Sequence, residues 1–341
     1  MDGINIMKRK TENKPRRTNP EKGPLLEVRD LKTWFPIKRG LFSLTAGHVL
    51  AVDGVSFVIH RNETLGLVGE SGCGKTTLGR TLLGLERTTG GDILFDGISI
   101  PQMNRRQMNR LRRHMQVVFQ DPLSSLNPRM NVMDIVMEGL VQFGMVEGSK
   151  QDHAAQLLGE VGMGRDAIYR WPHEFSGGQR QRISIARALS LKPDLIICDE
   201  AVSALDVSVQ AQVINLLAQL QKDHRLSYLF ISHDVSVVSN IADRVAVMYL
   251  GEIVEIGNTA DIVGNPLHPY TRMLIASVPV AGGKRIREHV VRGETPSPAS
   301  PPKGCRFHPR CPDVMARCRK IPPAVTENEG HQVMCHLYCR T

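Results

Sequence analysis

GESGCGKTT, residues 69–77, is the stretch that decides which fold this sequence is expected to have. It follows the apolar run LGLV and fits the pattern G-x-x-x-x-G-K-[ST], with Gly69, Gly74, Lys75 and Thr76 at the fixed positions. Glycines let the backbone curl until successive N–H groups point at an anion, and the N-terminus of a following helix adds positive charge. The stretch therefore predicts a phosphate-binding loop. Lys75 would reach the β- and γ-phosphates of a nucleotide, and the Thr76 hydroxyl would ligate Mg²⁺.

Two carboxylates follow a second apolar run, DLIICDE at 194–200. A buried strand here would deliver Asp199 to its carboxyl end, where a carboxylate suits a Mg²⁺ site. Glu200, one residue further on, would orient and polarise an attacking water. Two acids after a strand are by themselves an ordinary loop start, and it is the glycine loop that favours the functional interpretation.

The composition is that of a globular protein with an excess of basic residues. Of the 341 residues 41% are hydrophobic, and the net charge is +9. Residues 1–22 are basic and lack the apolar stretch of a signal peptide, which favours a disordered tail, with contact to anionic lipid or nucleic acid as the alternative. No apolar run approaches the ~20 residues that a membrane span needs. Seven cysteines without a secretion signal favour a reducing cytoplasm.

Strand and helix patterns along the chain predict an α/β fold. Strand patterns cover 25–31, 49–59, 64–69, 92–97, 115–120, 194–200, 227–233 and 244–257, and helical patterns cover 75–85, 182–190 and 208–223. The segment from about 121 to 191 lacks strong strand patterns and predicts a helical subdomain inserted into the main domain, 23–265. A proline-rich stretch at 295–304 and the cysteines after it indicate a separate C-terminal extension, 266–341.

Further motifs give the chain a resemblance to a known family. FSGGQRQR (175–182), SALD (203–206) and SHD (232–234) accompany the glycine loop and CDE in the order found in the ATP-binding subunits of ABC transporters. AVDGVSF, VFQDPLSSLNPRM, NPLHPYTRMLIASVP and CRFHPRCP are similar to the dipeptide and oligopeptide importer branch. The resemblance covers about residues 24–340. It implies a P-loop ATPase core with a mixed sheet, the inserted helical subdomain and a small cysteine-rich C-terminal extension.

The resemblance also implies a role for each matching residue. It implies that Glu200, His233 and Gln120 are catalytic, and that Thr76, Gln120 and Asp199 hold Mg²⁺. The residues implied to contact ATP are Phe35, Gly69, Ser71, Gly72, Gly74, Lys75, Thr76, Thr77, Ser176, Gly178, Gln179 and Asp206. In the family, the signature motif at 176–179 closes over the nucleotide of the opposite subunit. One departure is Ala201, where the family usually carries a proline that would stiffen the turn after Glu200.

Five cysteines crowd into the C-terminal extension with the spacing C-x5-C-x6-C-x16-C-x3-C. This spacing lacks the paired C-x2-C units typical of zinc sites. The resemblance implies a [4Fe–4S] cluster held by Cys305, Cys311, Cys318 and Cys335, with zinc as the less favoured occupant and Cys339 spare. The alternative is a small tail packed with free thiols.

The resemblance finally implies an assembly at the cytoplasmic face of the inner membrane, with this chain as a peripheral subunit. One glycine loop and one signature make half of a two-site dimer, so a second ABC ATPase is expected; a heterodimer is favoured and a homodimer is open. Two membrane permease subunits are the direct partners, with the segment at 121–141 forming a groove for a permease helix. An extracytoplasmic substrate-binding protein acts indirectly, and no nucleic acid is expected.

The expected activity is ATP hydrolysis coupled to import of dipeptides or oligopeptides. The cargo is open among dipeptides, longer peptides, nickel complexes and glutathione-like compounds. A soluble ABC ATPase acting on ribosomes or DNA is the alternative of another class. The sequence shows neither the fused second ATPase unit nor the long coiled coil that such proteins usually carry.

Overall fold

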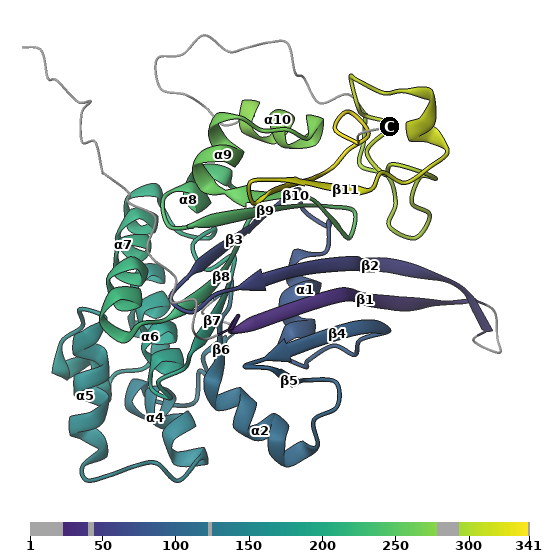
Figure 1. The fold of residues 1–341 in the computed structure, drawn as a ribbon. Coiled ribbons are helices and arrows are strands. Elements are labelled where there is room, and N and C mark those ends of the chain that lie inside the picture. The colour runs from purple at the N-terminus through teal and green to yellow at the C-terminus, as the bar shows by residue number, and fades with distance from the viewer. Residues whose placement is uncertain (1–22, 40–43, 122–124, 278–292, 340–341) are drawn as a thin grey trace, which may run out of the picture.

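The computed structural model describes residues 23–39, 44–121, 125–277 and 293–339, and places their strands in two sheets (Figure 1). The predicted basic tail at 1–22 lies outside the described residues. The strands are β1 (Leu26–Arg39), β2 (Leu44–Ile59), β3 (Thr64–Val68), β4 (Gly90–Phe95), β5 (Ile98–Ser99), β6 (Met115–Val118), β7 (Leu195–Asp199), β8 (Ser227–Ser232), β9 (Arg244–Tyr249), β10 (Glu252–Asn258), β11 (Val325–Asn328) and β12 (His331–Met334).

Helices cover both faces of the larger sheet and build the region between β6 and β7 (Figure 1). They are α1 (Lys75–Leu82), α2 (Arg105–His114), α4 (Val132–Gln142), α5 (Lys150–Glu160), α6 (Gly177–Leu189), α7 (Val207–His224), α8 (Val235–Ser239), α9 (Thr259–Gly264) and α10 (Pro269–Ala276), with the short 3₁₀ helices η1 (Arg165–Tyr169), η2 (Pro172–Glu174) and η4 (Ala316–Arg319). Among the described residues, no helix combines the length and the apolar character needed to cross a membrane.

The larger sheet has the strand order β11-β12-β10-β9-β3-β8-β7-β6. The five strands from β9 to β6 run parallel, whereas β10, β12 and β11 pair antiparallel. β3, β7 and β8 are buried along their whole length, as a parallel sheet covered on both faces requires. The α/β fold with a mixed sheet that the sequence predicted is confirmed.

Side chains of the larger sheet alternate between two cores. Leu229 and Ile231 belong to the core shared with α1 and the smaller sheet, whereas Tyr228 and Phe230 belong to the core shared with α6 and α7. The smaller sheet, β2-β1-β4-β5, is antiparallel and faces α1. The larger sheet, called the main sheet from here on, is therefore the middle layer, and a hydrophobic core covers each of its faces.

Between β6 and β7 the described chain is helical. α4, α5 and α6 pack against one another, and each begins at a residue whose side chain accepts a hydrogen bond from a backbone amide: Asn131, Ser149 and Ser176. These helices occupy the segment where a helical subdomain was predicted, and residues 122–124 lie outside the described residues. The boundaries of the predicted domains stay predictions.

Two of the differences from the sequence prediction have a plain local cause. The strand predicted at 244–257 is a hairpin, because the chain turns at Leu250 and Gly251, whose φ angles are 43° and 84°. Helix α2 was not predicted, since it is mostly basic and buries only Leu111. Its signal lies in its start, where Asn104 and Gln107 form a reciprocal capping box.

The C-terminal extension continues the main sheet. β12 pairs with β10, and β11 pairs with β12. Phe307 is buried, with its ring centroid 5.3 Å from that of Tyr249 and 5.4 Å from that of Tyr270. Packing of these aromatic rings ties the extension to the strand β9.

We expect acid pH to destabilise the fold through His268, which caps α10. Its side chain is buried, and its Nδ1 accepts a hydrogen bond from the amide of Tyr270 at 3.0 Å. Burial, with a smaller contribution from the charge of Arg272, lowers the pKa of His268 from 6.5 to about 3. Between these values the unfolded chain binds a proton that the folded chain does not. The contribution of His268 to stability is therefore complete above about pH 6.5 and decreases as the pH falls.

Urea unfolding at about pH 7.5 and about pH 5 tests this expectation, with H268N as the comparison because asparagine caps a helix without titrating. The wild-type chain should lose up to about 2 kcal/mol more unfolding free energy than the variant between these conditions. Equal losses in both chains would contradict the assignment to His268.

Candidate nucleotide-binding site

Four segments that carry predicted site residues leave the main sheet at one edge. The glycine loop follows β3, Glu200 follows β7, His233 follows β8, and Gln120 lies two residues after β6. These strands are parallel, so their carboxyl ends share an edge. Ligands of open α/β sheets bind at this edge. The topology thus gathers residues from distant parts of the sequence.

The glycine loop is shaped by contacts that leave no room for side chains. A Cβ on Gly74 would lie 2.0 Å from the carbonyl oxygen of Ala51, and a Cβ on Gly69 would lie 2.2 Å from a backbone carbonyl of β9. Gly74 also has a φ of 109°, which only glycine adopts without strain. The buried Lys75 Nζ donates to the carbonyl oxygens of Gly69 at 2.8 Å and Glu70 at 3.0 Å. The loop therefore holds its ammonium group at the start of α1, where an anion is favoured.

A hydroxyl and a carboxylate meet between this loop and β7. Thr76 Oγ1 donates a hydrogen bond to Asp199 at 3.1 Å. Burial raises the pKa of Asp199, and the hydrogen bond from Thr76 acts in the opposite direction. Oxygen donors of this kind suit Mg²⁺, so the pair fits the metal that the sequence predicted. Gln120, the third predicted ligand, is exposed and makes no hydrogen bond to either residue within the described structure.

Glu200 and His233 approach each other at the same edge. Oε1 of Glu200 lies 3.6 Å from Nδ1 of His233. Glu200 has a left-handed backbone, with φ of 49°, a conformation that costs most residues about 1–2 kcal/mol. Its amide donates to the carbonyl of Ile231 at 3.0 Å, and its carbonyl accepts the hydroxyl of Ser203. These two hydrogen bonds fix the backbone of Glu200 although residue 201 is alanine and not proline. Backbone strain of this kind is typical of functional sites.

The predicted signature residues begin α6. Ser176 accepts a hydrogen bond from the amide of Gln179, and the Gln179 side chain bonds back to the amide of Ser176. A Cβ on Gly178 would lie 2.4 Å from Val209, so this glycine lets α6 approach α7. Ser176 and Gln179 are exposed, as is Asp206 at the start of α7, and in the described structure none of them bonds to the glycine loop of its own chain.

The remaining residues predicted to contact ATP lie in the glycine loop, in α1 and in β1. Ser71 and Gly72 are exposed in the glycine loop, and Thr77 lies in the first turn of α1. Phe35 is partly exposed in β1 and pairs with Val49 of β2. Val49 is two positions before Ala51, whose carbonyl oxygen lies against the glycine loop. The roles of all the predicted site residues stay predictions.

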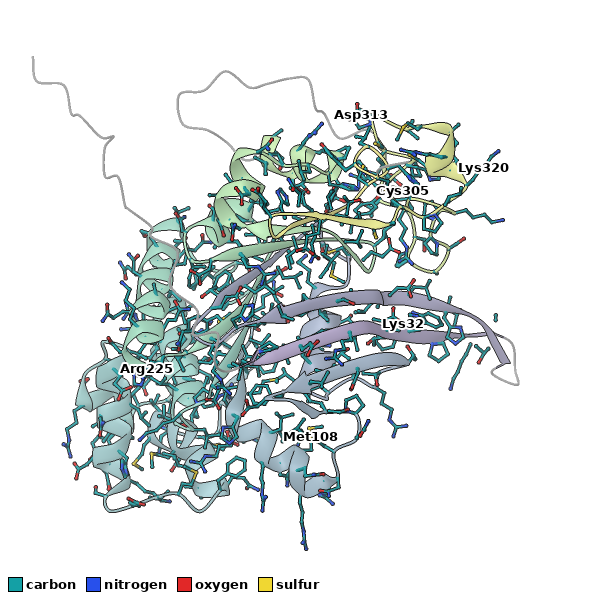
Figure 2. The ribbon with its side chains drawn as sticks, in the orientation of Figure 1. Lys32, Met108, Arg225, Cys305, Asp313 and Lys320 are labelled. Carbon is teal, nitrogen blue, oxygen red and sulfur yellow. The ribbon has the colours of Figure 1, made fainter. Side chains whose placement is uncertain are left out.

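The predicted iron–sulfur cluster is not supported. Its four cysteines, Cys305, Cys311, Cys318 and Cys335, are free thiols of the C-terminal region, where Figure 2 labels Cys305. Burial raises the pKa of Cys305 to about 11 and that of Cys311 to about 12. No three His, Cys, Asp or Glu side chains of the described residues are arranged to hold a metal ion. Within the described residues, neither the cluster nor zinc therefore has support.

The sequence interpretation missed one contact of the glycine loop with the C-terminal extension. The side chain of Glu70 pairs with Arg310 of the C-terminal extension. Glu70 occupies a variable position of the G-x-x-x-x-G-K-[ST] pattern, and Arg310 lies between Cys305 and Cys311. No sequence pattern indicates that they meet.

Comparisons with known proteins identify the family of this chain. The ABC transporter family model matches residues 52–203, and the model for the C-terminal region of oligopeptide/dipeptide transporters matches residues 254–318. The chain is 51% identical to the oligopeptide transport ATP-binding protein AppF of Bacillus subtilis, over 92% of this chain and 97% of that protein. It is 50% identical to a probable peptide ABC transporter ATP-binding protein of Sinorhizobium fredii, over 92% of this chain and 90% of that protein.

Solved structures show the same fold. CbiO1 of Clostridium perfringens, part of an ABC transporter complex, has a TM-score of 0.62 at 28% identity, over 71% of this chain and 91% of that one. An ATP-binding cassette solved as a dimer with ADP and Pi has a TM-score of 0.59 at 22% identity, over 69% of this chain and 98% of that one. The resemblance seen in the motifs is confirmed. The chain belongs to the ATP-binding proteins of ABC transporters, in the group that carries the oligopeptide/dipeptide C-terminal region.

Proposed function

We propose that this protein hydrolyses ATP to energise an ABC importer of dipeptides or oligopeptides. The observation that carries the proposal is the meeting, at one sheet edge, of the enclosed Lys75, the Thr76–Asp199 pair and the Glu200–His233 pair. The match of residues 254–318 to the oligopeptide/dipeptide transporter region supports peptides as the cargo. Nickel complexes or glutathione remain the alternative cargo of the same ATPase.

The reaction follows from the charges at this edge. Lys75 and the N-terminus of α1 stabilise the negative charge that spreads over the γ-phosphoryl group. Glu200 orients a water and accepts its proton while the water oxygen bonds to the γ-phosphorus. The bond from this phosphorus to the bridging oxygen breaks, which leaves ADP and phosphate. His233, beside Glu200, contacts the γ-phosphate. Mg²⁺, with Thr76 and Asp199 as ligands, supplies further neutralisation of the phosphates when bound.

The working unit in this proposal is a dimer of ABC subunits. The exposed start of α6 at Ser176 offers backbone amides and a partial positive charge, which favour the phosphate of a nucleotide held by a second subunit. ATP would hold the two subunits together, and hydrolysis would release them. A related but distinct ATPase is the favoured partner, with a second copy of this chain as the other arrangement.

Exposed apolar side chains mark where a permease would dock. Tyr169 is 66% exposed and Trp171 is 41% exposed, and Val141 at the end of α4 is 49% exposed. The carbonyl of Arg170 accepts the amide of Val132, which joins this aromatic pair to the start of α4. The docking surface predicted at 121–141 would therefore extend to 169–171. Apolar patches of this kind serve protein contacts.

We expect Y169E to uncouple ATP hydrolysis from transport, because a buried unpaired charge at the permease contact is unfavourable. Peptide uptake should fall at least about 10-fold, a loss of about 1.4 kcal/mol of coupling, while the ATPase activity of the isolated subunit stays unchanged. V325E is the matched control, since Val325 is 61% exposed on β11, at the other end of the main sheet. Normal uptake in Y169E, or equal loss in V325E, would remove this surface from the interface.

Purification of the tagged chain from membranes in mild detergent tests the assembly. Two polytopic permeases and a related ATPase should accompany it, at the cytoplasmic face of the membrane, with a substrate-binding protein reached only through the permeases. Peptide uptake by that complex then tests the cargo against nickel and glutathione. Ribosomal or DNA-bound partners without a permease would overturn the transport proposal and leave the ATPase chemistry standing.

A further inference from the structure

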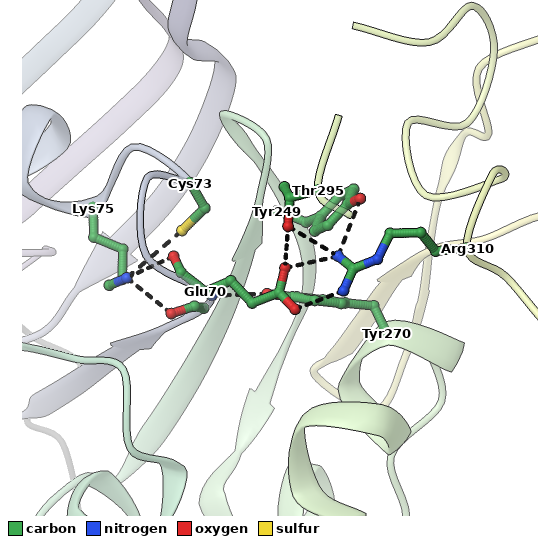
Figure 3. Close-up of polar contacts among 8 residues, drawn as sticks. Glu70, Cys73, Lys75, Tyr249, Tyr270, Thr295 and Arg310 are labelled. Atoms are coloured by element: carbon green, nitrogen blue, oxygen red, sulfur yellow. Dashed lines mark hydrogen bonds and ion pairs between the residues drawn. The ribbon is translucent and has the colours of Figure 1, made fainter. Parts of the chain in front are cut away.

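Three side chains of the C-terminal extension hold one residue of the glycine loop, Glu70 (Figure 3). Arg310 donates to both carboxylate oxygens of Glu70, at 2.7 and 2.8 Å. Thr295 donates to the same carboxylate at 2.9 Å, and the hydroxyl of Tyr270 accepts the backbone amide of Glu70, also at 2.9 Å. The loop is therefore fixed, through side chain and backbone, by residues 200 to 240 positions further along the chain.

Arg310 is itself held in place. Only 3% of its side chain is exposed, and its guanidinium carbon lies 5.8 Å from the ring centroid of Tyr249 and 6.0 Å from that of Phe307. Its amide donates to the carbonyl of Phe307, whose ring is buried beside Tyr249 and Tyr270. A planar guanidinium that bonds a carboxylate at two points fixes orientation as well as distance. Arg310 thus acts as a rigid support for Glu70.

The ion pair lies beside the lysine that would bind the phosphates. The backbone carbonyl of Glu70 accepts a hydrogen bond from Lys75 Nζ, so a movement of Glu70 would displace the ammonium group. Although burial acts in the opposite direction, the hydrogen bonds from Arg310 and Thr295 lower the pKa of Glu70. Its carboxylate is therefore charged. Without Arg310, this partly buried negative charge would remain on the loop and repel a triphosphate.

We propose that Arg310 is a positioning residue for ATP, which fixes Glu70 and cancels its charge so that the loop can accept the triphosphate. The inference rests on the proposed function, since it takes ATP as the ligand of this loop. Arg306 provides the contrast. It is also buried, and it pairs with Asp53 and Glu252, so it anchors the same extension without touching the loop.

Equilibrium ATP binding and steady-state ATP hydrolysis by the full-length chain test the proposal. R310Q should raise the Kd and KM for ATP at least about 10-fold, with a smaller change in kcat, because an unpaired buried carboxylate opposes binding. The matched control R306Q should lower Tm and leave the KM for ATP unchanged. The double variant E70Q/R310Q removes the unpaired charge and should recover most of the lost affinity, which a general loosening of the fold would not allow.

The results of these measurements separate a positioning role of Arg310 from a role in fold stability alone. An unchanged KM in R310Q, with an active wild-type chain, would overturn the inference. A KM that rises equally in R306Q, or that stays high in E70Q/R310Q, would show that Arg310 supports only the fold and would also overturn it. A wild-type chain that binds no ATP would instead remove the proposed function, so the two failures are distinguishable.

Discussion

Replacement of Glu200 by glutamine should lower the turnover of ATP at least about 100-fold, the contribution that a positioned general base commonly makes. The carboxylate lies 3.6 Å from His233 and is held by a left-handed backbone bonded to Ile231 and Ser203. Glutamine has the same shape but cannot accept the proton of the attacking water. The Kd for ATP should change little, because Lys75 and the glycine loop remain. Phosphate release and equilibrium nucleotide binding measure the two quantities separately.

A second consequence of E200Q is a longer-lived dimer, since ATP that is not hydrolysed keeps the subunits together. E147Q is the matched control, because Glu147 is exposed in the loop between α4 and α5. E147Q should match the wild-type chain in ATP turnover, in the Kd for ATP and in the lifetime of the dimer. Turnover that survives in E200Q would remove Glu200 from the assigned role and point to another base at the sheet edge.

Gly74→Ala should strongly weaken both nucleotide binding and the fold. The added Cβ would lie 2.0 Å from the carbonyl oxygen of Ala51, and that backbone belongs to β2 and cannot yield. The left-handed conformation costs alanine about 1–2 kcal/mol, and the overlap adds about 1–3 kcal/mol. Because Lys75 follows directly, the shift that relieves the overlap should raise the Kd for ATP at least about 100-fold, which is about 2.7 kcal/mol.

Gly97→Ala separates these two causes. Gly97 also has a positive φ, of 77°, but a Cβ there would meet nothing within 4 Å. It lies in the turn between β4 and β5, away from the sheet edge that carries the site. This variant should lose about 1–2 kcal/mol of unfolding free energy and bind ATP normally. Equal effects of the two alanines on ATP binding would show that the overlap with Ala51 is relieved without cost to the site.

Burial explains which elements could be predicted from the sequence. The strands at 64–68, 195–199 and 227–232 are buried on both faces, so their apolar runs are continuous and plain. The hairpin of β11 and β12 is short, and β11 is mostly exposed, so its residues carry no apolar pattern. Its pairing with β10 depends on tertiary contacts that local sequence does not express.

The nucleotide site was predictable where its chemistry depends on local spacing. The fixed residues of the glycine loop lie close together in the sequence: Gly69, Gly74, Lys75 and Thr76. Their spacing predicts a phosphate ligand. Spacing did not suffice for the cysteines, since the described residues include no group of three His, Cys, Asp or Glu side chains arranged to hold a metal ion. It also failed for Glu70 and Arg310, because a pair 240 positions apart is joined only by the fold.

The anchoring of Glu70 by Arg310 has a consequence for protein synthesis. The ribosome completes the glycine loop early and reaches its support 240 residues later, which takes roughly 10–50 s at ordinary elongation rates. A chain cut short before Arg310 would carry every nucleotide-binding motif and lack the residue that fixes the first of them. The residue that fixes the glycine loop is therefore the last part of the nucleotide site to be synthesised.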